Sequence, residues 1–310
     1  MLIAAAIVVL LVNIRCISAR ALLAPSNSTN ALEKTSSVPN IAVTGLPGGD
    51  PHGDFLPSFR YLGGPLIRSP VITTLAWGGG KNGKAVRNWA AVNSFLADLP
   101  NTKYMKWINK EYNVPKYVLK GGHFERELVI APPFKATVTD EDIQKTLKQL
   151  VKQKVLPRNT FGNALTVVFL PSGVSVSLQA SQLRSCIDLC AYNSAFQLNG
   201  KSYYYSVIPD QECAGIKNAL DCKKELSLVD ATTTAISYAY VAAKTNPEAA
   251  GSGWISFHDN GDLGIPCTGL TDRITGPTGV TWTVQQVWSD KDRTCRTEPG
   301  RPTLVKGLYN

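Results

Sequence analysis

The feature that most constrains the fold of this chain is a set of six cysteines in its C-terminal half. In a chain exported to an oxidising compartment, an even set of cysteines indicates disulfides, and six cysteines allow fifteen pairings. Because short loops close at the least entropic cost, the sequence favours pairing between neighbours. A zinc site built on Cys186-x-x-x-Cys190 is the alternative. The predicted structural bridges are Cys186–Cys190, Cys213–Cys222 and Cys267–Cys295.

The N-terminal sequence supports export. The apolar run from Leu2 to Val12 is too short to span a bilayer, which needs about 20 residues, but it has the length of a secretory signal core. Small residues at Ala19 and Ala21 offer a cleavage site, so residues 1–21 are predicted to be a signal peptide that takes Cys16 with it. A buried core helix is the alternative interpretation. No later stretch is apolar for long enough to anchor the protein, which is therefore predicted to be secreted.

The rest of the chain divides into a leader, a domain and a tail. Residues 22–57 are rich in Ser, Pro, Gly, Asn and Thr without helix or strand periodicity, so they are predicted to be a flexible leader. The leader holds the sequon Asn27-Ser28-Thr29, which makes Asn27 a candidate glycosylation site. Residues 58–300 have the pattern of one folded domain, and residues 301–310 form a C-terminal tail.

Within the domain, apolar β-branched segments alternate with segments of helical periodicity. The third predicted helix has the clearest start, with Thr139 as the N-cap, Asp142 at N3 and an apolar stripe behind them. Strands separated by helices indicate an α/β fold with a mixed sheet and flanking helices. Strands are predicted over 71–77, 165–170, 203–208 and 280–288, and helices over 84–98, 102–112, 139–151 and 231–243.

Positive charge is concentrated in one part of the chain. The net charge is +9, and residues 81–158 hold fifteen Lys and Arg against seven Asp and Glu. Two solvated helix faces are the simpler interpretation, and attraction to a polyanion such as an anionic glycan is the other. No nucleic-acid-binding motif accompanies the lysines, so no nucleic-acid partner is predicted. Two trios each line one side of a helix: Lys103, Lys106 and Lys110, and Lys145, Lys148 and Lys152.

Eight segments in a fixed order carry a family resemblance: 61–65 (YLGGP), the strand at 71–77, 104–107 (YMKW), 111–115 (EYNVP), 169–174 (FLPSGV), 185–192 (SCIDLCAY), 204–210 (YYSVIPD) and 286–289 (QVWS). In these segments the chain resembles the secreted EXORDIUM-like (phosphate-induced) proteins and their fungal and bacterial relatives, over about residues 58–296. The resemblance implies a zincin-like fold for the domain.

Relatives in that family commonly carry S-H-E-L-x-E-A-x-T-D-P and then G-E-I-G-D-x-C, a pair that looks like a zinc-metallopeptidase site. On a helix, positions i and i+4 share a face, so the His and the second Glu would ligate zinc while the first Glu polarises water. Here Tyr238 stands at the His position, Ala239 at the presumed base and Ala242 at the second ligand. Asn246 replaces the Asp of T-D-P, and Ile265 stands where the later Asp is expected. The resemblance therefore predicts a degenerate metal site.

Other candidates for catalysis are weaker. Asn193 follows Cys-Ala-Tyr where relatives often have His. His123 is predicted to lie in a loop or at a strand edge, His258 in a surface turn, and His52 in the leader. The chain has neither a G-x-S-x-G element nor a glycine-rich nucleotide-binding motif. No catalytic residue, metal or cofactor is predicted.

These observations support three hypotheses. The leading one is a secreted, non-catalytic, pseudo-metallopeptidase-like protein that acts by binding an extracellular protein or glycan, for example as a virulence effector at a host surface. The second is a secreted hydrolase whose active site the sequence does not reveal. The third is a cell-wall or matrix component whose basic helices bind anionic polysaccharide. Zinc content separates the first two, and salt-sensitive binding identifies the third.

Overall fold

The computed structural model describes residues 56–78, 85–132, 135–159, 161–178, 181–216, 221–248, 252–256 and 261–300. The predicted signal peptide, the leader up to residue 55, the sequon at Asn27, His52, His258 and the tail lie outside these residues. Among the helices of the described part, none has the length and apolar character needed to cross a membrane.

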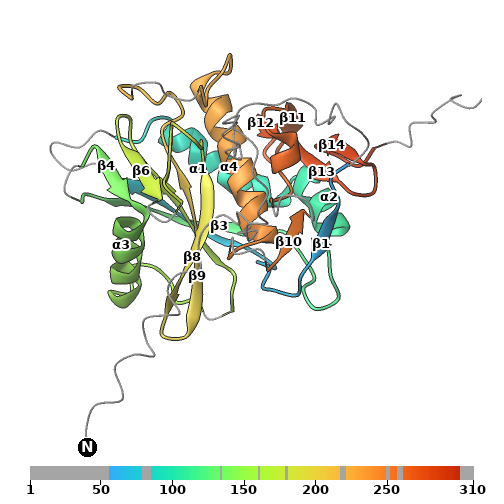
Figure 1. Ribbon diagram of the computed structural model, residues 1–310, viewed down its shortest axis with the longest axis horizontal. Helices are drawn as coiled ribbons and strands as arrows, with labels where there is room; N and C mark the ends of the chain where they lie inside the picture. Colours follow the sequence, from blue (N-terminus) through green and yellow to red (C-terminus); the bar gives the residue numbers. More distant parts are fainter. Residues whose placement is uncertain are drawn as a thin grey trace, which may run out of the picture.

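A five-stranded sheet forms the centre of the molecule, in the order β3-β2-β5-β9-β8 (Figure 1). Strands β2, β3, β5 and β9 run parallel to one another, and only the edge strand β8, which pairs with β9, is antiparallel. The predicted mixed α/β arrangement is therefore confirmed, as are three of the predicted strands. The bounds are β2 Val71–Trp77, β3 His123–Ile130, β5 Ala164–Phe169, β8 Tyr192–Leu198 and β9 Lys201–Ile208.

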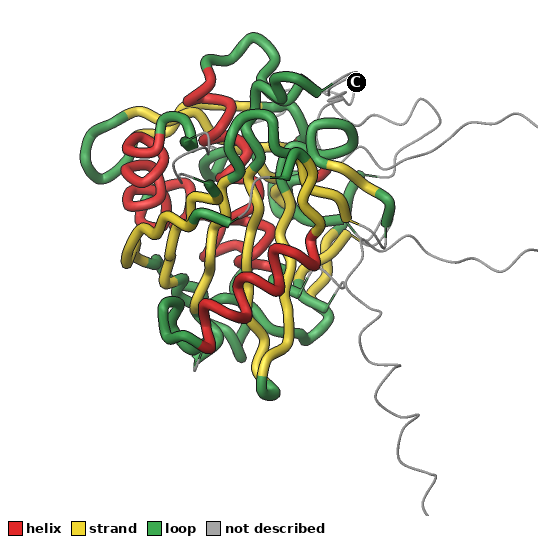
Figure 2. The backbone as a smooth tube through the Cα atoms, turned by 90° about the vertical axis from the view of Figure 1, so that its left-hand side faces the viewer, coloured by secondary structure: helices red, strands yellow, loops and turns green. Residues whose placement is uncertain are grey.

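The inner strands are rich in apolar and aromatic residues because both faces of the sheet are buried. In β9, the side chains of Tyr204 and Ile208 join one core while Tyr205 and Val207 join the other. The first core lies beneath helices α1, α2 and α4, and the second beneath α3. In Figure 2 a helix crosses the strands on the side facing the viewer, which is the side of α3 in Figure 1. The sheet is thus the middle layer of three.

The four α-helices are α1 Trp89–Asp98, α2 Lys103–Glu111, α3 Asp140–Lys152 and α4 Leu228–Thr245. The predicted cap of α3 is confirmed, because Thr139 and Asp142 form a reciprocal capping box. The prediction that the first helix starts at residue 84 is wrong. Asn88 has a φ of 56°, a left-handed conformation that a right-handed helix cannot contain, so α1 begins at Trp89.

The C-terminal region consists of short hairpins. Strand β11, Thr271–Thr275, pairs with β12, Thr281–Gln285, and β13, Val287–Ser289, pairs with β14, Thr294–Arg296. A single strand over 280–288 is therefore a wrong prediction. At Gln286 the backbone N–H donates to Leu270, and beyond it the chain changes partner from β11 to β14. The other elements are β1 Phe59–Tyr61, β4 Thr137–Thr139, β6 Ser175–Leu178, β7 Leu183–Arg184, β10 Trp254–Ser256 and the 3₁₀ turns Leu99–Asn101 and Ile265–Cys267.

The three disulfides correct two of the predicted pairings. Cys267–Cys295 is present as expected, but the other bonds are Cys186–Cys213 and Cys190–Cys222. The reason is the antiparallel β8–β9 hairpin, in which Tyr192 lies opposite Val207, so that residues preceding β8 meet residues following β9. Ring size alone favours disulfides between cysteines that are neighbours in sequence. Pairing of β8 with β9 brings the two cysteine segments together, so the bonds form between the segments instead.

Candidate functional site

Helix α4 carries most of the predicted site and is held between the sheet and hairpin β11–β12. Ser227 caps it by accepting a hydrogen bond from the Asp230 N–H. Three of its polar side chains bind β12: Thr233 Oγ1 donates to the Thr283 carbonyl, Ser237 Oγ accepts from the Gln285 N–H, and Asp230 accepts from Thr283 Oγ1. These residues are spaced three and four apart, so they share one helix face.

The positions that the family resemblance aligns with a metal site on α4, Tyr238, Ala239 and Ala242, are buried and lack metal-binding groups. Ala239 and Ala242 are almost fully buried and have no donor atoms. The Tyr238 side chain is also buried, and burial, with a smaller contribution from the negative charge of Asp262, raises its pKa well above 10. The phenol is therefore neutral at physiological pH and is a poor zinc ligand. These residues do not fit a zinc ion.

The second segment of the predicted site lies against α4. Asn246 Nδ2 donates to Asp262 at 3.0 Å, and Asn246 Oδ1 accepts from the Gly253 N–H at 3.1 Å. Gly264 lies against the Tyr238 ring, where an added Cβ would approach Tyr238 Cδ2 to 2.6 Å. Ile265 is partly buried and packs on the core. The structure thus brings the two predicted segments together through the Asn246 amide and the close approach of Gly264 to Tyr238.

Two further polar candidates have structural partners. The buried Asn193 donates through Nδ2 to the Asn246 carbonyl at 3.0 Å. His123 is exposed at the start of the edge strand β3, in agreement with its predicted place at a strand edge. Neither lines the cavity described next.

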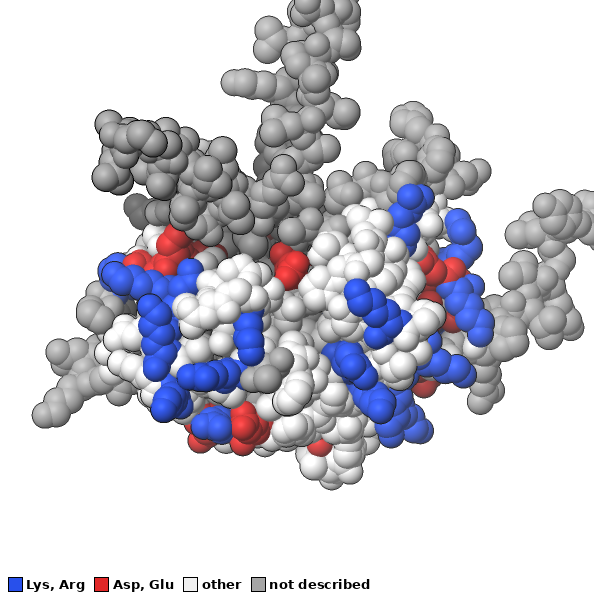
Figure 3. All heavy atoms as spheres, turned by 90° about the horizontal axis from the view of Figure 1, so that it is seen from below, with Lys and Arg blue, Asp and Glu red and all other residues white. Residues whose placement is uncertain are grey.

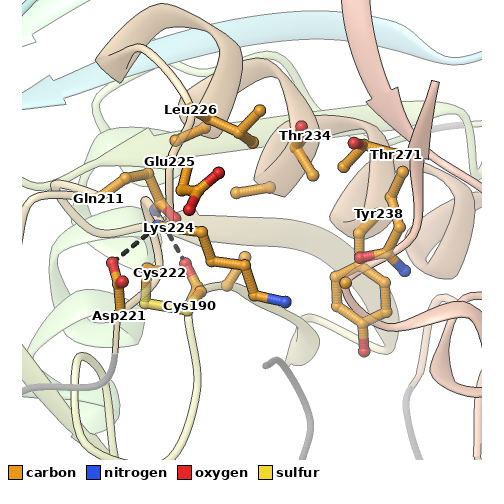
Figure 4. A pocket seen from close by; sticks show the side chains of 15 residues that line it. Cys190, Gln211, Asp221, Cys222, Lys224, Glu225, Leu226, Thr234, Tyr238 and Thr271 are labelled. Atoms are coloured by element: carbon orange, nitrogen blue, oxygen red, sulfur yellow. Dashed lines mark hydrogen bonds between the residues drawn. A yellow bond between two sulfur atoms is a disulfide. The ribbon is translucent and has the colours of Figure 1, made fainter. Parts of the chain in front are cut away.

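A cavity of about 480 Å³ opens beside the first half of α4 (Figure 4). We call it the α4 cavity. Tyr238 and Ala235 of α4, Gln211, and the Cys190–Cys222 disulfide lie in its wall. Of the five positions that the resemblance aligns with a metal site, Tyr238 alone lines it. The volume lies within the range of about 300–1,000 Å³ that small-molecule sites occupy.

Two buried polar atoms in this wall have no hydrogen-bond partner: Gln211 Oε1 and Thr234 Oγ1. Gln211 is only 1% exposed, and its Nε2 donates to the carbonyls of Cys190 at 3.0 Å and Pro209 at 2.7 Å. These two bonds fix the amide orientation, because only the nitrogen can donate to carbonyls. Seven buried side-chain polar atoms of the described residues have no hydrogen-bond partner, and two of them belong to residues that line this one cavity, which makes it the candidate place for a ligand.

Charged groups lie at the rim of the α4 cavity and are exposed: Asp221, Lys224 and Glu225. The Lys224 backbone N–H donates to the Asp221 carboxylate at 2.7 Å, which orders this turn. The deeper wall residues Gln211, Ala235 and Tyr238 are uncharged. The cavity therefore combines a neutral interior with a charged rim.

The two lysine trios lie on different helices, as predicted. On α2, Lys103, Lys106 and Lys110 are exposed. On α3, Lys145 and Lys152 are exposed, whereas the Lys148 ammonium lies 5.4 Å from the centre of the Phe196 ring. The α3 trio borders a surface groove together with Gln144 and Gln149. Seen from below, Lys and Arg gather in two groups, and the surface between them is mostly uncharged with a small acidic patch (Figure 3).

Sequence reasoning missed Gln211 and Thr234, because neither belongs to a motif and their importance depends on burial without a partner. Within the described ranges, no three His, Cys, Asp or Glu side chains form a group that could hold a metal ion. Comparisons of this chain with protein-family models, curated proteins and solved structures find no match.

Proposed function

We propose that this chain is a secreted, non-catalytic binding protein, a pseudo-metallopeptidase-like relative of the EXORDIUM-like proteins, and that it binds its extracellular partner through the α4 cavity. The observation that carries the proposal is the wall of this cavity. It has two unpartnered buried polar atoms, Gln211 Oε1 and Thr234 Oγ1, beside a helix that lacks metal ligands. Such a cavity can recognise a molecule, but Ala239 and Ala242 supply neither base nor ligand for hydrolysis.

The zincin-like part of the proposal is supported by the position of the motif. The segment that resembles the relatives' zinc-binding helix is helical, follows the sheet in sequence and packs on β9 and β8. Asp262, from the second predicted segment, reaches Asn246 at the end of that helix. A metal site assembled from two such segments requires this proximity. Substitution of the metal ligands would remove the metal site and leave the two segments in contact.

Extracellular location is supported by the three disulfides, because such bonds persist in oxidising compartments. A partner at a host surface, as expected of an effector, and a partner in the producer's own wall both agree with this location. The α3 groove favours the second candidate function, binding of an anionic polysaccharide, because the three lysines that line it outnumber its one carboxylate, Glu141.

The proposal is tested by elemental analysis of the disulfide-bonded protein after dialysis, combined with a peptidase assay on an unstructured protein substrate. We expect no stoichiometric zinc and no cleavage, because Tyr238 is neutral and two of the motif positions have no donor atoms. The control is the variant with Tyr238→His, Ala239→Glu, Ala242→Glu and Ile265→Asp, which should gain zinc if the framework is that of a metallopeptidase. About one zinc per chain in the unmodified protein would contradict the proposal and favour the hydrolase hypothesis.

A further inference from the structure

We infer that the α4 cavity binds a neutral, hydroxyl-bearing small molecule, most simply one or two sugar units at the end of a glycan. This inference rests on the proposed function, since it names the chemical class of the ligand for the same cavity. It follows from the hydrogen-bonding capacity of the cavity wall, the position of the charged side chains at the rim and the volume of the cavity.

The cavity wall has an unpartnered hydrogen-bond acceptor at Gln211. The two hydrogens of its amide nitrogen already bind the carbonyls of Cys190 and Pro209, so Oε1 remains as a fixed acceptor. A ligand must therefore present an O–H or N–H to this atom. Because the amide orientation is set before binding, the contact costs little further ordering of the protein.

The second unpartnered atom, Thr234 Oγ1, accepts as well as donates. Figure 4 shows Gln211 near the disulfide and Thr234 across the cavity, on α4. A ligand that satisfies both atoms needs polar groups at separate points, and at least one of them must be a donor. Hydroxyl groups meet both requirements, because each one donates and accepts.

The charges argue for a neutral ligand. The ionisable side chains that border the cavity at its rim are exposed, and the buried Gln211, Ala235 and Tyr238 carry no charge. An ammonium or carboxylate in the interior would lose its hydration without meeting a buried counter-charge, which is strongly unfavourable. Sugar rings avoid this cost, and their apolar faces match Ala235, the Tyr238 ring and the disulfide.

The test is titration of the full-length, disulfide-bonded protein with three neutral disaccharides, cellobiose, maltose and diacetylchitobiose, followed by saturation-transfer NMR and calorimetry. The key variant is Thr234→Val, which removes the hydroxyl and keeps the shape. Since Thr234 Oγ1 has no partner, this change should leave the midpoint of urea unfolding unchanged. It should weaken sugar binding about tenfold, the effect of losing one hydrogen bond.

Thr73→Val is the matched control. Thr73 Oγ1 is also buried without a partner, but it lies in β2, away from the α4 cavity, so this variant should bind sugar like the unmodified protein. A third variant, Ala235→Leu, fills the cavity and should abolish binding. Three results would each overturn the inference: no binding of any of the three sugars by the folded, zinc-free protein, binding unaffected by Thr234→Val, or a preference for butylamine or acetate. Each of them leaves the non-catalytic proposal standing, whereas bound zinc would remove that proposal first.

Discussion

Removal of the Cys190–Cys222 bridge, by Cys190→Ala together with Cys222→Ala, tests how the cysteine region is held. If it were the only bond, it would close a loop across a separation of 32 residues in the unfolded chain. The loop entropy removed from the unfolded state would then stabilise the fold by about 3.7 kcal/mol. The neighbouring Cys186–Cys213 bond already joins the same two segments. With that bond intact, the second bridge closes only a ring of about 13 residues, so its removal should cost about 3 kcal/mol.

The stability measurement is urea unfolding without reductant, followed by tryptophan fluorescence. Removal of all four cysteines of these two bridges should cost about 6.5 kcal/mol, because the larger loop is then released as well. In contrast, nearest-neighbour bridges would close rings of about four and nine residues, for which the same relation gives a combined loss of about 4.4 kcal/mol.

A thiol titration of the denatured double variant supplies the sharper result. If Cys186 is bonded to Cys213, the variant has no free thiol among its domain cysteines, since Cys267 and Cys295 are also joined. If neighbours in sequence were paired, the substitutions would break two bonds and release two thiols. Two free thiols per chain, or a loss of stability below about 1 kcal/mol, would refute the argument from the β8–β9 hairpin.

Two further predictions concern charged side chains. Lys244 is fully buried, its ammonium donates to the carbonyls of Ile67, Arg68 and Lys120, and burial lowers its pKa to about 7. Because the unfolded chain then binds the proton more tightly, with a pKa of about 10.4, the free energy of unfolding should rise with pH between these two values. From pH 7 to pH 9 the rise should be about 2 kcal/mol larger than in Lys244→Met, and equal slopes in urea titrations of the two proteins would exclude the shift. On α3, replacing the trio with Gln should release the protein from a heparin column at lower salt than the same replacement on α2, because the α3 lysines line a surface groove; equal elution would make both trios ordinary solvated surface. The α3 trio is Lys145, Lys148 and Lys152, and the α2 trio is Lys103, Lys106 and Lys110.

The elements that sequence predicted well are those whose signal is local. Segment 71–77 consists of apolar and β-branched residues because β2 is buried on both faces, and Thr139 caps α3 through bonds within four residues. The prediction failed where partners distant in sequence decide the outcome. The alternating strand β3, over 123–130, has a mostly exposed or half-buried pattern that does not resemble a buried strand. The break at Gln286 depends on Leu270, which the residues around 286 do not reveal.

The residues of the candidate site also fall into two groups, those that the sequence indicates and those that it does not. Tyr238, Ala239 and Ala242 are candidates that the sequence supplies, because the family resemblance implies an expected residue at each position. Gln211 and Thr234 could not, since a glutamine becomes a binding group only when its nitrogen is occupied and its oxygen is buried. That condition depends on the Cys190 and Pro209 carbonyls, which the folding of the disulfide-bonded segment brings next to the Gln211 amide.

Hydrogen bonds hold α4 to the surrounding chain at its middle and at its C-terminal end. Ser237, which precedes Tyr238, binds the Gln285 N–H of β12, and Asn246 binds both Asp262 and the Gly253 N–H. Replacing either residue would leave buried polar groups without partners, which costs about 1–3 kcal/mol for each group. Ala242 needs no such partner, because the alanine side chain is apolar. Hydrogen bonds between protein groups therefore hold α4 in place on both sides of Tyr238, and the cavity beside Tyr238 is open to a ligand.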